Sequence, residues 1–451
     1  MSSTSIPTYI INLEKRAERR QFAENQFCKH PEFNVNFFKA IQDSNPAFGL
    51  YKSLRTIIES ARKKRFPLVL ICEDDHKFSN EYQFDVLKSY LERVEKYEAD
   101  VFAGGVSWFN CALPAEEDLY WIDNFTGAQF LIIYERFYQK ILNSRFTEVD
   151  IIDQWISKLS DKIFVAVPML SVQHDFGYSD VTPKNNVEGR VDVLFSDTRK
   201  RWETLKDVIA HTKRAITIYS PVDVEQDMQL STYVLNTDHH TDRLASIQQQ
   251  FDYRQEFDIS VIRIENRKSE VFELWNALQH IVEIASEQEE DVILICQDDH
   301  VFCDAYNKLA LFESIYQGAF LGADIILGST AVTQQIIPVS NHLSWTSVFQ
   351  DSSFIVIYSS LFQTILDSTF DDNDSVDKKL SSLTANKYII YPFVSGRKEF
   401  ACSETKNDAL SIKQNSPNYG LSERKILEVM KMFNRLTIKN NKDTTDLTVI
   451  N

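Results

Sequence analysis

The residues best suited to chemistry form an acidic run, Glu73, Asp74 and Asp75, directly after the apolar stretch LVLIC. Neighbouring carboxylates repel one another, and a hard divalent cation relieves that repulsion. An isolated EDD more commonly marks a helix start, where one aspartate caps the helix and the others are solvated. The run alone therefore leaves a metal site and a helix cap open.

The acidic run occurs twice, because ILICQDDHVF at 293 to 302 repeats the pattern with Asp299 lying 224 residues after Asp75. The same offset aligns three further pairs of segments without a gap. They are YIINLEKRAERR with YVLNTDHHTDRL, FTGAQFLIIYERFYQKIL with FQDSSFIVIYSSLFQTIL, and VPMLSVQHDFGYSD with YPFVSGRKEFACSE. Such self-similarity indicates two related domains in tandem. We predict domains at 1–218 and 229–451, with the boundary near residues 215 to 230.

Each copy alternates apolar strands with helices. In the first copy we expect strands at 9–13, 35–40, 68–72 and 99–103, and helices near 50–62 and 135–143. Polar helical stretches at 196–214 and 422–436 close the two copies. This pattern predicts an α/β fold with a mostly parallel sheet covered on both faces. Because ligands bind at the carboxyl ends of such strands, the acidic run lies where a ligand is expected.

Length and composition narrow the class of protein. The 451 residues exceed what one hydrophobic core usually organises, which also predicts two domains. A hydrophobic content of 43% is typical of a globular protein. The net charge of -17 argues against a sequence-blind nucleic-acid binder, since such proteins need basic surface. A nucleotide ligand is still compatible with this charge, because a local basic cluster or a metal can neutralise a diphosphate.

The sequence also predicts the compartment. The start, MSSTSIPTYIINLEKR, lacks the pattern of a signal peptide, and no run of 18 apolar residues predicts a membrane span. Six cysteines without a CxxC pair favour reduced thiols in a cytoplasmic protein. They are Cys28, Cys72, Cys111, Cys296, Cys303 and Cys402.

The order of four motifs gives a family resemblance. YIINLEKRAERR, the EDD that closes a strand, FTGAQFLIIY and PMLSVQHDFGYSD together resemble family 25 glycosyltransferases over essentially all of each repeat. That family includes lipopolysaccharide and collagen galactosyltransferases. The resemblance implies two tandem GT-A-like, Rossmann-like domains, a nucleotide-sugar donor and transfer with inversion. One departure is YKSLRT, where Leu54 stands in place of the histidine in the family's usual Cys-x-x-Ser-His.

The resemblance also implies a nucleotide-sugar site. Asn12 and Arg19 would lie in the segment that holds the nucleotide, with Arg16 near the diphosphate. Either arginine also fits a solvated helix start. Glu73 or Asp74 would face the sugar or ribose hydroxyls. The family's late glutamine and Ser-Asp pair correspond to Gln173, Ser179 and Asp180.

A metal site follows from the same resemblance. Asp75 would bind the ion, with Asp74 beside it and His174 as a further ligand from late in the domain. His174 fits a surface or core histidine equally well. Carboxylate ligands with water and phosphate oxygens suit manganese or magnesium, and manganese is favoured.

An inverting transfer needs a general base to take the proton of the acceptor hydroxyl. TEVDIIDQWISKL offers Asp150 and Asp153, whose spacing predicts one helix face. Asp150 is the first choice, because the family has an aspartate there. The alternative is a structural role, with Asp150 as the N-cap of the helix and Asp153 in its first turn. Three nearby tryptophans suit either stacking on an acceptor sugar or core packing: Trp108, Trp121 and Trp155.

The two copies differ in the remaining candidate positions. Both keep two aspartates after the strand and a pair equivalent to Asp150 and Asp153. The second copy has Gln297 for Glu73, Asp351 for Gly127, Arg397 for Gln173, Lys398 for His174 and Glu404 for Asp180. A protonated lysine cannot bind a metal. The first copy is therefore predicted to be the catalytic one.

The sequence thus predicts a metal-dependent, inverting glycosyltransferase of lipopolysaccharide-biosynthesis type. It would transfer a hexose, galactose favoured, from a UDP-sugar to a glycan, lipid or peptide hydroxyl. Two alternatives stay open. Both domains could act in successive transfers, or the chain could be a non-catalytic scaffold that binds nucleotides or carbohydrates, which the missing Cys-x-x-Ser-His favours.

Overall fold

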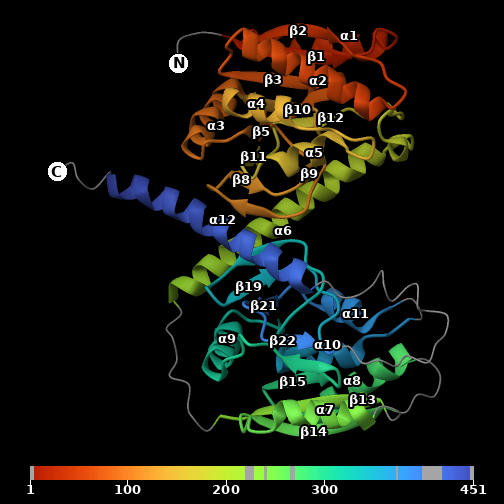
Figure 1. The fold of residues 1–451 in the computed structure, drawn as a ribbon, viewed down its shortest axis with the longest axis vertical. Helices are drawn as coiled ribbons and strands as arrows, with labels where there is room; N and C mark the ends of the chain where they lie inside the picture. Colours follow the sequence, from red (N-terminus) through yellow and green to blue (C-terminus); the bar gives the residue numbers. More distant parts are fainter. Residues whose placement is uncertain are drawn as a thin grey trace. The chain divides into compact units, whose positions relative to one another are not determined.

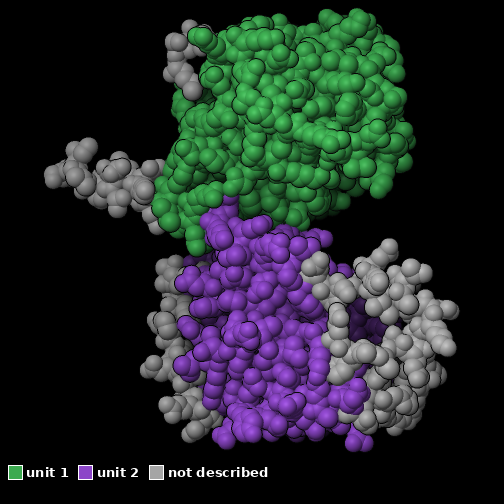
Figure 2. Space-filling model, in the orientation of Figure 1, with its two compact units in different colours: residues 1–207, 433–451 green, residues 208–432 purple. Residues whose placement is uncertain are grey.

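The chain forms two compact units, which Figure 2 shows in different colours. The computed structural model describes residues 5–218, 228–237, 241–264, 270–371, 374–398 and 419–446. The first unit comprises residues 1–207 and 433–451, and the second comprises residues 208–432. The division falls within two long helices, α6 (Arg190–Ile218) and α12 (Tyr419–Asp446). Residues 219–227, which span most of the predicted boundary, lie outside the described residues, so that boundary stays a prediction.

The first unit is built on a sheet in the order β2-β1-β3-β10-β5-β11-β8-β7 (Figure 1). Strand β1 pairs in parallel with β2 and β3, and β5 pairs in parallel with β11. Strand β10 lies antiparallel between β3 and β5, and β8 runs antiparallel to β11 and β7. The strands are β1 Ile6–Asn12, β2 Phe33–Lys39, β3 Leu68–Glu73, β5 Val101–Ala103, β7 Ala112–Pro114, β8 Leu119–Ile122, β10 Phe130–Tyr134 and β11 Ile163–Ala166. Six of these eight strands run in one direction, and β8 and β10 run in the other, which confirms the prediction of a mostly parallel sheet.

The second unit repeats this sheet in the order β14-β13-β15-β20-β17-β21-β19-β18. Its register is the same, since the pair Thr8 and Leu70 corresponds to Thr232 and Leu294. The strands are β13 Leu230–Thr237, β14 Phe257–Ile264, β15 Val292–Gln297, β17 Ile325–Leu327, β18 Ile336–Pro338, β19 Leu343–Thr346, β20 Phe354–Tyr358 and β21 Lys387–Ile390. The predicted fold, two tandem GT-A-like domains related by duplication, is confirmed.

Helices connect the strands in both units. In α2 (Pro46–Lys63) the Asn45 side chain caps the start, and an apolar face containing Leu54 is buried. Leu54 is thus a core residue, which accounts for an apolar side chain at that position. The others are α1 Ala17–Phe27, α3 Phe84–Lys96, α4 Glu135–Asn143, α5 Ile152–Leu159, α7 Thr241–Phe251, α8 Glu270–Glu287, α9 Lys308–Phe320, α10 Phe362–Asp367 and α11 Val376–Leu383, with short 3-10 turns at Pro183–Asn185 and Ser359–Leu361.

Short two-stranded ribbons extend beyond the sheet edge in the first unit. Strand β4 (His76–Phe78) pairs with β12 (Ser171–Gln173), and β6 (Trp108–Phe109) pairs with β9 (Phe125–Thr126). The second unit repeats the former ribbon as β16 (His300–Phe302) with β22 (Ser395–Arg397). These ribbons bring segments from the middle and end of each domain to the carboxyl ends of its central strands.

Candidate active site

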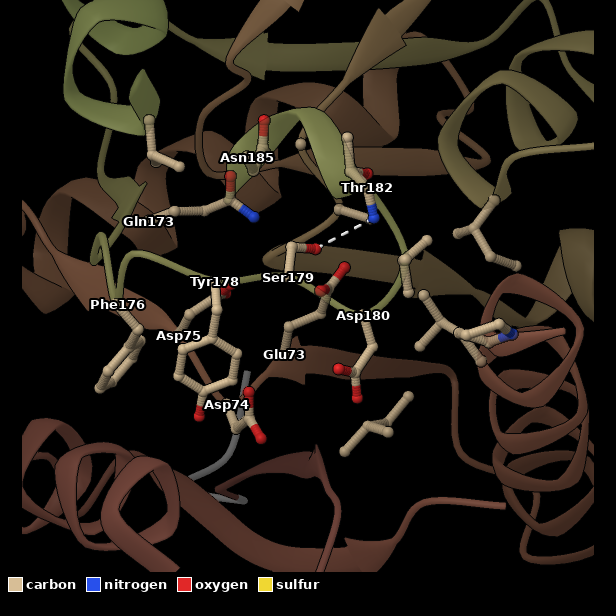
Figure 3. A pocket seen from close by; sticks show the side chains of 18 of the residues that line it. Glu73, Asp74, Asp75, Gln173, Phe176, Tyr178, Ser179, Asp180, Thr182 and Asn185 are labelled. Atoms are coloured by element: carbon tan, nitrogen blue, oxygen red, sulfur yellow. Dashed lines mark hydrogen bonds between the residues drawn. The ribbon is translucent and has the colours of Figure 1, made fainter. Parts of the chain in front are cut away.

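A pocket of about 660 Å³ lies at the carboxyl ends of β1 and β3 in the first unit (Figure 3). This volume suits a small-molecule ligand. Ten of the twelve predicted site residues line it: Arg16, Arg19, Glu73, Asp74, Asp75, Asp153, Gln173, His174, Ser179 and Asp180. Asn12 and Asp150 do not belong to this lining. The structure therefore brings ten of the predicted residues together in one pocket, and the other two are not part of its lining.

Asp74 is held by residues from the first strand and helix. Its Oδ2 accepts a hydrogen bond from Asn12 Nδ2 at 2.8 Å, and its Oδ1 accepts one from Arg19 Nη1 at 3.2 Å. Asn12 and Arg19 are both buried. Burial lowers the pKa of Arg19, but the nearby Asp75 and Asp74 carboxylates raise it further, so the net pKa lies above its usual value. Asn12 thus positions a carboxylate, while its predicted contact with a nucleotide stays a prediction.

The loop after β12 forms hydrogen bonds with Arg19 and an ion pair with Arg16. Arg19 Nε donates to the Tyr178 hydroxyl at 3.1 Å, and Arg19 Nη2 donates to the Tyr178 carbonyl at 2.5 Å. Asp180 forms an ion pair with Arg16 at 2.6 Å and lies 3.8 Å from Lys15. Sequence reasoning missed Tyr178 and Lys15, although both lie within motifs that it used. Ser179 Oγ accepts the Thr182 backbone N–H, as the dashed line in Figure 3 marks.

The other two acidic residues of the run carry unusual electrostatics. Asp75 Oδ1 is buried without a hydrogen-bond partner among the described residues, and Asp75 Oδ2 lies 3.7 Å from Arg19 Nη1. Burial and the neighbouring Asp74 carboxylate raise the pKa of Asp75. Burial, then the Asp75 and Asp153 carboxylates, raise the pKa of Glu73 well above its usual value. These carboxylates therefore repel one another in a poorly solvated place, which a bound cation would relieve.

The predicted metal residues do not form a closed set of ligands. Within the described part of the chain, no group of three or more His, Cys, Asp or Glu side chains is arranged to hold a metal ion. The His174 ring stacks on Phe22, with centroids 4.5 Å apart, and Asp74 already accepts two hydrogen bonds. Asp75, with its unpartnered oxygen, fits an ion that takes its remaining ligands from water and phosphate, as magnesium often does.

Asp150 and Asp153 occupy different environments. Helix α5 begins at Ile152, so the expectation that both aspartates share a helix face is wrong. The Asp150 carboxylate accepts hydrogen bonds from the Thr147 backbone, the Thr147 hydroxyl and Lys158, and these bonds lower its pKa to about 2. It does not cap α5, whose N-cap is Ile151. A turn and a lysine therefore hold Asp150 outside the pocket lining.

Asp153, in contrast, is buried and lines the pocket. Its Oδ2 accepts the backbone N–H of Gly127 at 2.8 Å. Burial raises its pKa, although backbone hydrogen bonds from Gly127 and Gln154 act in the opposite direction. Of the two aspartates, Asp153 is therefore the one placed to meet a ligand.

His76, which follows the acidic run, has a structural role. It is completely buried, its Nδ1 lies 2.8 Å from Ser171 Oγ, and burial lowers its pKa to about 3. In the second unit His300 makes the same contact with Ser395 at 2.9 Å. This histidine joins the two short strands and is therefore retained in both copies.

The second unit keeps the carboxylate support but changes what surrounds it. Asn236 and Arg243 donate to Asp298 at 2.9 and 3.3 Å, matching the bonds around Asp74. Arg397 Nη1 lies 2.8 Å from Asp351 Oδ1 and 3.6 Å from Asp299 Oδ2, and Nη2 donates to Gln297 at 2.5 Å. The guanidinium group of Arg397 thus lies next to Asp299, the aspartate equivalent to Asp75.

Of the two other candidate residues that differ between the copies, the structure describes one. Lys398 Nζ donates to Ser246 Oγ at 2.9 Å, while Glu404 lies outside the described residues. Five cysteines are free thiols, and the sixth, Cys402, lies outside the described residues as well.

Within the described residues, every helix is too short or too polar to cross a membrane.

The strand order is GT-A-like, and the carboxylate pocket lies at the ends of its central strands. Residues 5–65 match the model of glycosyltransferase family 25, described as an LPS biosynthesis protein. This match confirms the resemblance to that family, over residues 5–65. The matched segment contains Asn12, Arg16 and Arg19.

Comparison with solved structures finds several similar chains. An apo UDP-glucose pyrophosphorylase is 12% identical, with a TM-score of 0.27, covering 44% of this chain and 82% of its own. Mannose-1-phosphate geranyltransferase from Thermus thermophilus is 9% identical, with a TM-score of 0.25, covering 63% and 99%. The apo-form glycosyltransferase GlyE of Streptococcus pneumoniae is 10% identical, with a TM-score of 0.21, covering 65% and 91%. Comparison with curated proteins finds no match.

Proposed function

We propose that the first domain transfers a hexose, galactose favoured, from a UDP-sugar to a hydroxyl of a glycan, lipid-linked or peptide acceptor. The transfer inverts the anomeric carbon and uses a divalent ion, manganese favoured. The observation that carries this proposal is the pocket itself, in which Asp75 presents an unpartnered buried oxygen beside Glu73 and Asp153. Such a site attracts a cation and, with it, a diphosphate.

The donor side of the proposed site combines acidic and basic groups. Asp75 would hold the ion, which when bound offsets negative charge on the departing diphosphate. Arg16 and Lys15 are paired with Asp180, an exposed carboxylate for which a diphosphate can substitute. Glu73, which lines the pocket, would face the sugar or ribose hydroxyls.

Asp153 is the general base of the proposed reaction. It takes the proton of the acceptor hydroxyl while that oxygen forms a bond to the anomeric carbon and the bond to the diphosphate oxygen breaks. Its raised pKa makes it a better proton acceptor than an ordinary aspartate, and the Gly127 N–H fixes its orientation. Asp150, the first choice from the sequence, is bound to Thr147 and Lys158 instead.

A second, non-catalytic role is proposed for the second domain. Arg397 pairs with both Asp299 and Asp351, so the carboxylate equivalent to Asp75 is already neutralised by the protein. This pairing favours one active domain over two successive transfers. We also propose a cytoplasmic location, which the five free thiols support.

Calorimetric titration of UDP, UDP-galactose and UDP-glucose with manganese tests the donor and the ion together. We expect at least one UDP-sugar to bind, and its affinity to fall sharply when excess chelator replaces manganese. Equal affinity in chelator would contradict the role of the ion. Failure of all three ligands to bind with manganese present would contradict the UDP-sugar donor.

A further inference from the structure

Trp108 stands apart from the other tryptophans. All six tryptophans lie in the described residues, and five of them are at most 5% exposed, whereas Trp108 is 37% exposed. Trp108 also lines the pocket. Single exposed apolar side chains are common on protein surfaces, but this ring lies in the wall of a pocket, where its face is open to a ligand. Trp108 is therefore the tryptophan that a ligand in this pocket can contact.

The backbone around Trp108 leads directly to the proposed base. Trp108 pairs with Thr126 across the β6–β9 ribbon, and the next residue, Gly127, donates its N–H to Asp153. Gly127 has a φ of +105°, and a Cβ there would lie 2.8 Å from the Ser107 nitrogen. Glycine adopts this left-handed conformation without strain, and a side chain here would force the Ser107 backbone to shift. The ribbon thus connects Trp108, through Thr126 and Gly127, to the carboxylate that would receive a proton, and both side chains line the same pocket.

The second unit shows that the fold does not need this exposed ring. The buried Trp121 recurs as Trp345, and each donates its indole N–H to a backbone carbonyl at 2.7 Å. Trp108, however, is replaced by Val332. Ser107, Thr126, Gly127 and Ile151, which also line the pocket, are replaced by Ala331, Gln350, Asp351 and Ser375. The lining near Asp153 has therefore changed, while Asp153 itself recurs as Asp377.

We propose that Trp108 is the platform of an acceptor subsite and that the acceptor is a saccharide, an inference that rests on the proposed transfer. The C–H face of a pyranose is apolar and slightly positive, which matches the negative face of an indole ring. The half-exposed Ile151 extends the apolar surface. The Ser107 and Thr126 hydroxyls, 3.0 Å apart, offer partners for the sugar's hydroxyl groups.

Fluorescence quenching tests the platform without any donor. Since the other tryptophans are buried, acrylamide quenching should report mainly on Trp108. The probes are methyl glycosides of galactose, glucose and N-acetylglucosamine, lactose, and a serine-containing peptide. We expect at least one saccharide to lower the quenching constant by about half and the peptide to leave it unchanged. Protection by the peptide, or by none of the saccharides, would overturn the proposal.

Steady-state kinetics with the protecting saccharide as acceptor provides the second test. Trp108→Ala should raise the acceptor KM about tenfold, and Trp108→Phe should restore most of it. Val332→Ala, at the matching position of the second domain, should leave the KM unchanged. An unaltered KM in Trp108→Ala would refute the platform.

The two proposals fail in different ways. All these variants should bind UDP with manganese as the wild type does. If the wild-type protein did not bind UDP, the proposed donor would be refuted. Protection of Trp108 from acrylamide by a saccharide would still support the subsite in that case. Normal UDP binding without saccharide protection would refute the acceptor subsite alone.

Discussion

The two domains hold the first aspartate of the acidic run in the same way, but they differ in the groups around the second aspartate. The asparagine and arginine that hold the first aspartate recur with nearly the same distances, 2.8 and 3.2 Å against 2.9 and 3.3 Å. The groups facing the second aspartate have changed, because Arg397 now pairs with Asp299 and Asp351. The recurring contacts therefore support the first aspartate in both domains. The changed contacts distinguish a pocket in which Asp75 Oδ1 has no hydrogen-bond partner from a place where Arg397 pairs with the equivalent aspartate.

The largest expected effect concerns Asp75. Asp75→Asn should lower turnover by roughly two to four decades, about 3 to 5 kcal/mol of transition-state stabilisation, because the ion would lose its protein ligand. Turnover is measured with the UDP-sugar that binds in calorimetry, and circular dichroism checks folding. Near-normal turnover in a folded variant would remove Asp75 from the site.

The next effect separates the two candidate bases. Asp153→Asn should lower kcat by about two to three decades while the affinity for UDP changes little, because a base acts in the transition state. Asp150→Asn should leave kcat within about threefold of wild type. The reverse pattern would restore Asp150 as the base and displace Asp153.

A smaller effect tests the self-paired site of the second domain. Arg397→Gln should destabilise that domain by about 2 kcal/mol, because Asp299 and Asp351 would be left partly buried and unpaired. Adding Asp351→Gly should recover most of the loss, since it removes one carboxylate and places glycine where φ is +60°. Urea unfolding measures both variants. If the double variant gained nothing, Arg397 would not be compensating for Asp351.

The smallest effect is the structural role of Asp150. Asp150→Asn should cost about 1 kcal/mol of unfolding free energy at pH 7, from weakened bonds to Thr147 and Lys158. The folded pKa of about 2 is below the unfolded value. The wild-type advantage should therefore be complete above about pH 4 and vanish as the pH falls towards 2. Denaturant titrations across that range check this, and a pH-independent difference would contradict the assignment.

Much of the fold could be predicted because the apolar strands are continuous and the duplication repeats them. The helix expected near 135–143 was found at Glu135–Asn143, and the strand expected at 68–72 ends one residue later, at Glu73. The ribbons were not predicted, because two- or three-residue strands leave no periodicity. Residue spacing also could not show that α5 begins after Asp150, since the helix start depends on the turn around Thr147.

The site was only partly predictable for a related reason. Motif order located the carboxylates, yet whether a polar residue faces a ligand or supports a neighbour depends on burial. Asn12 supports Asp74, and His76 joins two strands, although both residue types also suit ligand binding. Trp108 and Trp121 likewise have the same residue type and opposite exposure. Comparing the two copies separates these tryptophans, because the buried Trp121 recurs as Trp345 and the exposed Trp108 is replaced by Val332.

The central claim, that one domain of the two performs transfer, is tested most directly by product mass. Asp75→Asn and Asp299→Asn proteins are assayed with the same UDP-sugar and acceptor, and the products are measured by mass spectrometry. The structure predicts that Asp299→Asn makes the wild-type product at a similar rate, whereas Asp75→Asn makes almost none. A product one sugar shorter from Asp299→Asn would show that both domains catalyse and would contradict the account.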